Sequence, residues 1–599
     1  MHFVVALLLV TSVHLATGAA AWTQVGLLAD DHEVIGAAIL RHRGAWTFES
    51  IFAPEVPPDS VRALYRPFIE LGFWLEQPWF GAQAFGYHVV NSMLHCATAL
   101  LWFQLLRRLS GSVALALAAA VAFVGWPGHS EATHWIAART SPQSGFFLTG
   151  ALLVLDVAMA HNGRSRAALL WLAAAAAVLA IGSKESAVLV LPLAAVLAWH
   201  RARTGGRVLA RALAALRAVA PMLLACFLWL AWRAHVLGTW GSGRNYGWKL
   251  QRITTEVCGD WAAVLVAPVH SSYVSPAWTA ALWLLHGSLL VAASWAWRAA
   301  SIRSVLGLGV VLVLLGYVAG IGLEPLDLGT LQNVRYTYEA SLGLAALFGL
   351  GIAMLPLRAR GAALAVLVLA HAIVLDGNRR SWLRAARVYE HLEHEIGQVA
   401  STTQQPIRVV DAPGVYEGAF ALLNGFTEFK FMQAFAPPGA NLRGAVSSTQ
   451  EWEAVLRELA AAAAAPQPLV NTYTVGWNDG ALVPLELDAS WPREVWPGTT
   501  ICYARVARTR PFVGSLVPVH VLVQTRAGCE LQVQARCGDR SLPGSAARVA
   551  AGNEAQAIVL SLRLPEDIEV GRDIEFECIV RGGEVEARYG LGRTTAVLR

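Results

Sequence analysis

Long apolar runs dominate the first 376 residues and constrain the fold more than any other feature of the chain. A helix needs about 20 apolar residues to cross a membrane, and about eleven runs approach this length. They lie near residues 3–28, 84–106, 112–127, 143–160, 166–182, 185–199, 218–237, 276–297, 304–322, 337–356 and 361–376. With 56% hydrophobic and 15% charged residues, the chain is predicted to be an α-helical polytopic membrane protein.

Arginine residues between these runs predict the orientation in the membrane. They cluster in alternate short loops, and cytoplasmic loops carry such an excess of positive charge. The clusters lie at 107–108, 164–166, 201–217, 298–303 and 358–360. The extracytoplasmic face then receives the segments 29–83, 128–142, 238–275 and 323–336, and everything after residue 377. This topology accounts for the net charge of +5, so we expect the lipid bilayer and not nucleic acid as a partner.

The first apolar run permits two interpretations. "VVALLLV" followed by "ATGAAAW" resembles the core and small-residue cleavage site of a signal peptide. An uncleaved first span is favoured because no Lys or Arg precedes the core and apolar character continues to Leu28. Both interpretations leave the next residues outside the cytoplasm.

The character of the chain changes after residue 376, which we take as the end of the transmembrane domain (1–376). Residues 377–404 contain an amphipathic pattern typical of an interfacial helix. Residues 405–599 form a β-rich extracytoplasmic region, with "IRVVDAPG" as one short strand. From about residue 500, runs of period-two alternation between Gly, Pro and Asp turns predict an antiparallel β-sandwich. Cys529, Cys537 and Cys578 offer one disulfide, with the pair left open.

Two adjacent carboxylates, Asp30 and Asp31, follow the first apolar run directly. Adjacent residues cannot point the same way from a helix, so one is expected to act and the other to support it. Asp31 is the expected catalytic base, and Asp30 is expected to orient it or to cap the helix that follows. Capping of a helix that starts near His32 is also a sufficient structural explanation for one of the two.

Single cations with aromatic neighbours are distributed over the same outer segments. Cations near a carboxylate pair indicate a substrate that carries phosphate. The predicted substrate-binding residues are Arg66, His129, Glu131, Arg139, Lys184 and Arg335. For Lys184, an ion pair with Glu185 is an equally good explanation.

Histidines in these segments have a simpler interpretation. His88, Asn91 and His95 share one helical face, where a polar seam between helices is favoured over a site. His129, Glu131 and His134 lack the HExxH spacing, so no metal ligand is assigned. A divalent cation, Mg²⁺ or Mn²⁺, held by paired carboxylates stays open as a cofactor.

Five segments occur in an order that resembles one family. They are "DDHEVIG", "YRPFIELGFWL", "FGYHVVNSMLHCATALL", "AFVGWPGHSEATHWIAARTS" and "GSKESAVLVLPL". In this order they are similar to the membrane half of the TMTC-type O-mannosyltransferases and their bacterial relatives, within the GT-C glycosyltransferases. The resemblance covers roughly residues 20–200 and extends more loosely to about 376. TMTC proteins carry tetratricopeptide repeats in their C-terminal half, where this chain has its β-rich region.

The resemblance implies a GT-C-like fold, a multi-pass location that we expect in a bacterial inner membrane, and an extracytoplasmic active site. It implies a polyprenyl-phosphate sugar donor and a protein or glycan acceptor, with the acidic motif of the first outer loop at Asp30 and Asp31. A carboxylate there would remove the proton of the acceptor hydroxyl. The alternatives are a ligase or polymerase of lipid-linked glycans, and a lipid flippase or transporter.

Overall fold

The computed structural model divides into two compact units, one of residues 1–387 with 416–420 and one of 388–415 with 421–599. The structure describes residues 2–19, 21–44, 46–52, 65–202, 208–238, 240, 253–298, 302–321 and 329–402. Beyond these it describes 407–410, 415–416, 419–420, 442–446, 473–478, 481–484, 493–506, 516–552, 556–565, 573–583 and 585–595. Each unit is described by itself.

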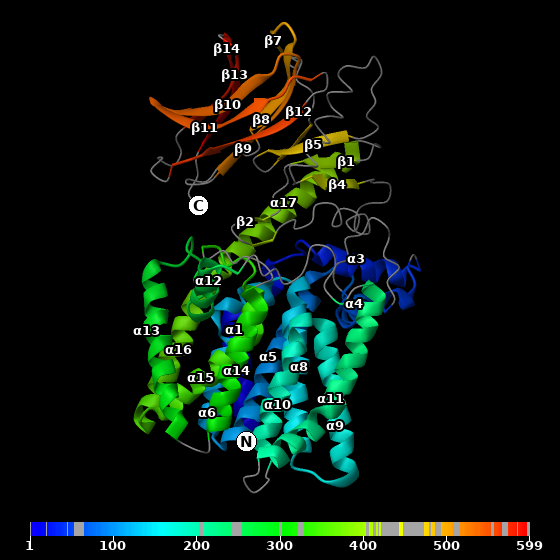
Figure 1. Cartoon of the computed structure of the whole chain (residues 1–599), viewed down its shortest axis with the longest axis vertical. Coiled ribbons are helices and arrows are strands. Elements are labelled where there is room, and N and C mark those ends of the chain that lie inside the picture. The colour runs from blue at the N-terminus through cyan, green and yellow to red at the C-terminus, as the bar shows by residue number, and fades with distance from the viewer. Residues whose placement is uncertain are drawn as a thin grey trace. The chain divides into compact units, whose positions relative to one another are not determined.

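The first unit is a bundle of helices (Figure 1). Every apolar run predicted from the sequence coincides with a helix. These helices are α1 (His2–Gly18), α5 (Ala84–Ser110), α6 (Val113–Val124), α8 (Thr140–Ala158), α9 (Gly163–Ser183), α10 (Val190–Arg201), α11 (Val208–Leu237), α13 (Pro276–Ser294), α14 (Arg303–Ile321), α15 (Tyr338–Met354) and α16 (Leu357–Asn378). The prediction of a multi-span helical protein is therefore confirmed.

The expected number of about eleven spans is too high for the part of the chain that the structure describes. Eight helices there are long and apolar enough to cross a membrane, or nine if the bent pair Val113–Val124 and Pro127–His134 counts as one span. The predicted runs at 143–160 and 185–199 do not qualify. The helix α8 begins with the polar residues TSPQSG, and α10 has only 12 residues because the 3-10 turn Glu185–Leu189 precedes it.

Helix α15 lies at the centre of this bundle, with 89% of its span buried. It packs against α6, α13 and α14. A Cβ atom added to Gly343 would come within 2.6 Å of the carbonyl oxygen of Gly309 in α14. Small residues allow such close approach of helices in membranes, so α15 can hold residues at its N-terminus in fixed positions.

Short helices lie between the spans at one end of the bundle. The segment after α1 forms α2 (Ala21–Gln24), α3 (Asp31–His42) and, after the turn Phe48–Ile51, α4 (Pro67–Phe80). Figure 1 places α3 and α4 at the end of the bundle opposite the N-terminus. An ion pair of 2.6 Å between Arg41 and Glu70 joins them. The turns Pro127–His129 and Ala137–Arg139, with α7 (Ser130–His134) between them, and the turn Val334–Thr337 lie in two of the other predicted outer segments. Helix α12 (Thr255–Val266) lies in a further one.

The second unit contains the β-strands expected after residue 405. β1 (Ile407–Val410), β4 (Leu442–Val446) and β5 (Tyr473–Asn478) run parallel, and β6 (Ala481–Pro484) pairs antiparallel with β5. "IRVVDAPG" therefore contains the predicted strand. Helix α17 (Arg380–Thr402) covers most of the predicted interfacial helix, and the division between the two units falls within it, after Arg387. β2 (Val415–Tyr416) pairs with β3 (Ala419–Phe420), and of these residues Tyr416, Ala419 and Phe420 belong to the first unit.

Two four-stranded antiparallel sheets follow, and they share one hydrophobic core. One has the order β11-β10-β13-β14 and the other β12-β9-β8-β7. The strands are β7 (Arg493–Trp496), β8 (Thr499–Val506), β9 (Leu516–Thr525), β10 (Cys529–Cys537), β11 (Arg540–Val549), β12 (Gln556–Arg563), β13 (Asp573–Gly582) and β14 (Val585–Thr595). Cys529, Cys537 and Cys578 are buried in this core as free thiols, so the structure shows none of the disulfides that the sequence left open.

Candidate functional site

The first acid of interest, Asp31, is buried at the N-terminus of α3. One carboxylate oxygen accepts the backbone N–H of Leu28 at 2.9 Å, and the other accepts the backbone N–H of Ala137 at 2.6 Å. Burial raises the pKa of this carboxyl, and the two N–H groups act in the opposite direction. Asp31 therefore fastens the start of α3 to the turn Ala137–Arg139.

Asp30 is oriented differently from its neighbour. It occupies the N-cap position of α3, but its side chain makes no capping hydrogen bond. The carboxylate is only partly buried, and its charge acts favourably on the guanidinium of Arg335. Of the two acids, Asp30 is the one that a bound molecule can reach.

The backbone is strained directly before Asp30 and just before Arg335. Ala29, directly before Asp30, has φ 46°, and Leu331 and Asn333, just before Arg335, have φ 58° and 71°. Among the described residues these are the only non-glycine positions with positive φ. Such conformations are costly and concentrate at functional sites, so the acid and the cation are held by backbone that the fold forces into place.

Arg335 is fixed by a carboxylate and two aromatic rings. Its guanidinium forms an ion pair with Glu131, which also accepts the backbone N–H of Arg335 at 2.8 Å. The guanidinium lies 5.2 Å from the centre of the Trp135 ring and 4.7 Å from that of Tyr336. Glu131 is fully buried, whereas the Arg335 side chain keeps 15% of its surface exposed. Glu131 therefore holds the Arg335 guanidinium on its buried side.

Lys184 is buried beside Arg335, but its partner is not the residue expected from the sequence. Its ammonium lies 3.2 Å from the carboxylate of Glu339 at the start of α15 and donates to the hydroxyl of Ser141 at 2.9 Å and to the carbonyl of Arg335 at 3.2 Å. Only 3% of its side chain is exposed. Burial lowers the pKa of Lys184, and Glu339 opposes this effect. Lys184 holds the Arg335 backbone and has little surface for a ligand.

The ion partner of Glu185 is Arg66, and not Lys184 as the sequence suggested. The guanidinium of Arg66 donates to one carboxylate oxygen of Glu185 at 2.8 and 3.1 Å, and Arg233 of α11 lies 3.7 Å from the other. Arg66 is 23% exposed. Its charge and those of Lys184 and Arg335 act on one another. Three of the predicted cations thus lie close enough to act on one another, each paired with a carboxylate, and Arg66 and Arg335 are the partly exposed members of this cation cluster.

Arg139 and His129 are separate from this surface. Arg139 is fully buried, forms two hydrogen bonds of 2.7 Å with Glu76, and donates to Asn91 at 2.6 Å. His129 is buried and forms a 2.8 Å hydrogen bond with Ser341 of α15. It lies among the rings of His95, Phe123 and Tyr338. We therefore leave both out of the proposed binding surface.

The seam expected on α5 is confirmed. His88 lies 3.0 Å from the carbonyl of Val25, and Asn91 donates to the carbonyl of Ile136 at 3.1 Å. His95 lies 2.8 Å from the hydroxyl of Tyr338. All three are buried, so they join α5 to its neighbours.

The acids of the site do not by themselves form a metal-binding group. Within the described ranges, no group of three or more His, Cys, Asp or Glu side chains is placed to hold a metal ion. Both oxygens of Asp31 already accept backbone N–H groups. No metal ligand is therefore assigned among these residues.

Some residues of the site were not singled out from the sequence. Tyr336 and Glu339 follow Arg335 in the segment "VRYTYE", and Trp135 follows "EATH". Each lies within one to four residues of a predicted site residue, and an aromatic or acid at that distance was the available signal. Their roles depend on contacts between segments, which neighbours in sequence do not disclose.

Comparison with known proteins gives a local relationship. No family model matches the chain. The chain is 34% identical over 134 residues to protein O-mannosyl-transferase tmtc2 of Xenopus laevis. The similar segment covers 22% of this chain and 16% of the length of that relative. The resemblance to TMTC-type O-mannosyltransferases expected from the sequence is thereby confirmed over this segment.

Two solved structures of an archaeal enzyme align along nearly the full chain. They are the oligosaccharyltransferase of Archaeoglobus fulgidus in a complex with zinc and sulfate, and AglB from the same organism with an inhibitory peptide and a dolichol-phosphate. The first has a TM-score of 0.46 at 10% identity and covers 99% of this chain and 98% of that chain. The second has a TM-score of 0.45 at 10% identity and covers 100% and 98%.

Proposed function

We propose that this protein is a GT-C-type membrane glycosyltransferase that transfers a sugar from a polyprenyl-phosphate donor to an acceptor on the extracytoplasmic face. The observation that carries the proposal is the accessible acid, Asp30, whose charge acts on the partly exposed guanidinium of Arg335 at one end of the helical bundle. The segment related to an O-mannosyl-transferase supports the same activity. A lipid-linked donor can reach such a site while its chain stays in the bilayer.

In this mechanism Asp30 is the general base and Asp31 positions it. Asp31 was the expected base, but its oxygens are occupied by backbone N–H groups and shielded from solvent. The geometry therefore favours an exchange of the two roles. Asp30 takes the proton from the acceptor hydroxyl, and the acceptor oxygen forms a bond to the anomeric carbon of the sugar.

The bond between that carbon and the donor phosphate breaks in the same step, and the phosphate leaves with the bonding electron pair. Arg66 and Arg335 are the proposed partners of this charge, because they are the exposed cations of the cluster. Guanidinium groups bind phosphate through paired hydrogen bonds. Glu131 and Lys184, the latter paired with Glu339, hold Arg335 in position, and Glu185 holds Arg66.

The β-rich region is proposed to bind the acceptor or a partner protein. The acids and cations of the proposed site all belong to the first unit. Placement of the site and of residues 377–599 outside the cytoplasm rests on the distribution of arginine between the spans.

Donor hydrolysis tests the proposal most directly, since slow hydrolysis needs no acceptor. Purified protein is incubated with a panel of polyprenyl-phosphate sugars, and release of free sugar and polyprenyl phosphate is followed. We expect one donor to be hydrolysed. Consumption of lipid-linked glycan chains alone would favour a ligase or polymerase. Movement of intact donor across proteoliposomes that lack acceptor, without hydrolysis, would favour a flippase.

A further inference from the structure

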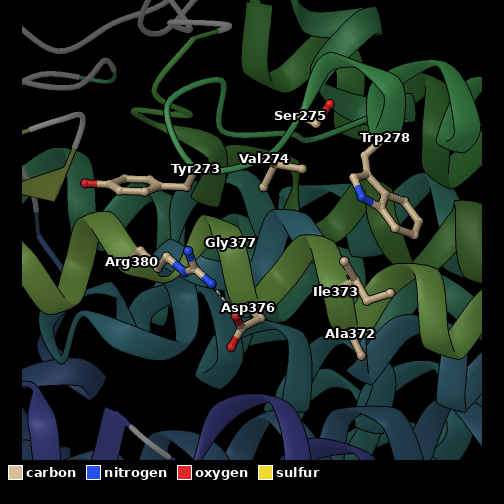
Figure 2. A pocket seen from close by; sticks show the side chains of 9 residues that line it. All are labelled: Tyr273, Val274, Ser275, Trp278, Ala372, Ile373, Asp376, Gly377 and Arg380. Atoms are coloured by element: carbon tan, nitrogen blue, oxygen red, sulfur yellow. Dashed lines mark hydrogen bonds and ion pairs between the residues drawn. The ribbon is translucent and has the colours of Figure 1, made fainter. Parts of the chain in front are cut away.

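A cavity lies in the first unit, outside the site described above. Its volume is about 390 Å³, and it lies between the loop before α13 and the end of α16 (Figure 2). Its walls include Tyr273, Val274, Trp278, Ile373, Asp376 and Arg380. A cavity of about 300–1,000 Å³ holds a small molecule or a head group, so the size suits a ligand of that class.

One wall of the cavity continues into an exposed apolar surface of the kind that contacts lipid. Helix α16 qualifies as a membrane span, and Val366, Leu369 and Ile373 form an exposed apolar row on it. Their spacing places them along one side of the helix. Ile373 lies at the end of this row and inside the cavity. A chain lying along α16 would therefore lead directly into the cavity.

The aromatic residues of the cavity place it at the membrane surface. Trp278 lies in the first turn of α13, and Tyr273 lies in the loop just before it. Tryptophan and tyrosine are enriched where hydrocarbon meets head groups, because their rings are apolar at one end and polar at the other. The cavity is therefore placed at head-group level.

The charges at the cavity have a positive excess. Asp376 is bound by Arg379 at 2.6 Å and by Arg380 at 3.3 Å, and the guanidinium of Arg384 lies 5.0 Å from the centre of the Tyr273 ring. Two guanidinium groups thus share one carboxylate, and a third lies over the Tyr273 ring. Figure 2 shows Arg380 beside Asp376 at the cavity, and 57% of the Arg380 side chain is exposed. Arg380 can turn from a carboxylate that Arg379 already neutralises to a ligand phosphate.

We propose that this cavity binds the head group of an anionic phospholipid. Its phosphate pairs with Arg380, the glycerol region lies against Trp278, and one acyl chain follows the apolar row of α16. The positive excess favours a head group with a net negative charge over one in which an ammonium cancels the phosphate. This inference is independent of the glycosyltransferase proposal, because the two sites share no residue.

Native mass spectrometry of the full chain in detergent tests this inference. Phosphatidylglycerol and phosphatidylcholine of equal chain length are titrated separately, and one bound molecule is counted. We expect phosphatidylglycerol to bind about tenfold or more tightly than phosphatidylcholine, and Arg380→Glu to remove that difference. Arg358→Glu is the matched control, because Arg358 is also an exposed arginine of α16 but lies at its other end. It should bind as the wild type does.

Equal binding of both lipids, or an unchanged preference in Arg380→Glu, would overturn the proposal. Two further measurements separate a lipid from free phosphate. Trp278→Ala should weaken phosphatidylglycerol binding, and inorganic phosphate should not displace the lipid at equal concentration. Complete displacement by inorganic phosphate would assign the cavity to the free ion. Arg380 and Arg358 are both exposed, so their substitution should leave the melting temperature unchanged.

Discussion

Replacing each of the two adjacent acids by asparagine should give opposite effects on activity and stability. Asp30→Asn keeps the size of the side chain but removes the proposed base. Loss of a positioned general base lowers a rate by about 10²–10⁴-fold. Asparagine keeps the hydrogen-bonding capacity of a side chain that does not cap α3, so the melting temperature should fall less than in Asp31→Asn.

Asp31→Asn should mainly lower stability. Both carboxylate oxygens accept backbone N–H groups, from Leu28 and Ala137. An asparagine presents one oxygen and one NH₂ group, so one buried N–H would face another donor. An unsatisfied buried donor costs about 1–3 kcal/mol. The remaining activity should be higher than that of Asp30→Asn when both are measured below their melting temperatures.

The assay pairs donor hydrolysis with thermal unfolding of the same detergent-solubilised samples. Glu33→Gln is a suitable control, because Glu33 lies in the first turn of the same helix and is not proposed to act on substrate. The reasoning fails if Asp30→Asn retains full hydrolysis. It also fails if Asp31→Asn melts like the wild type and is inactive, which would return the base role to Asp31.

Three other measurements test the site and the topology. Lys184→Met should destabilise the chain by about 3–5 kcal/mol, because it leaves Glu339 buried without its cation. Adding Glu339→Gln should restore much of the lost stability. An unchanged melting temperature in the single variant would contradict this prediction. Burial alone would raise the pKa of Glu185, but Arg66, Arg233 and a backbone hydrogen bond together lower it below its usual 4.5. The pair therefore stabilises the fold above this pH and the contribution is lost as the pH falls further, so Glu185→Gln should flatten the acid side of a melting curve against pH. A reporter that fluoresces only in the cytoplasm, fused after Arg599, should stay dark; bright fluorescence would reverse the proposed orientation.

Helix positions were predictable because their signal is local. A continuous apolar run fixes a helix whatever the rest of the chain does. Whether that helix is long and apolar enough to be a candidate span depends on its ends, and among the described residues eight or nine helices qualify where the sequence predicted about eleven. The polar start of α8 and the 3-10 turn Glu185–Leu189 before α10 shorten the apolar helix.

It was also predictable that the outer segments lie on one face, but the ion pairs between them were not predictable. Alternation of arginine between loops assigned the segments of Asp30, Glu131, Lys184 and Arg335 to one face, and the structure brings Glu131 and Lys184 into contact with Arg335, on which the charge of Asp30 also acts. Lys184 precedes Glu185 in sequence, yet its ion partner Glu339 lies 155 residues away. Sequence distance carries no information on such a pair.

The two adjacent acids show the same limit. That they point in different directions follows from the period of a helix. Which one faces inward depends on the N–H of Ala137, 106 residues further along the chain. The sequence of the acidic motif itself does not reveal that contact.

The ion pair between Lys184 and Glu339 also imposes an order on biosynthesis. Because Glu339 lies 155 residues after Lys184, about 8–30 s of translation at about 5–20 residues per second separate the two. During that interval the helices up to α14 are made while the ammonium of Lys184 still lacks its carboxylate. A charge without a partner is tolerated only where water reaches it. The growing chain must therefore keep this end of the bundle hydrated until α15 is inserted and brings Glu339 to Lys184.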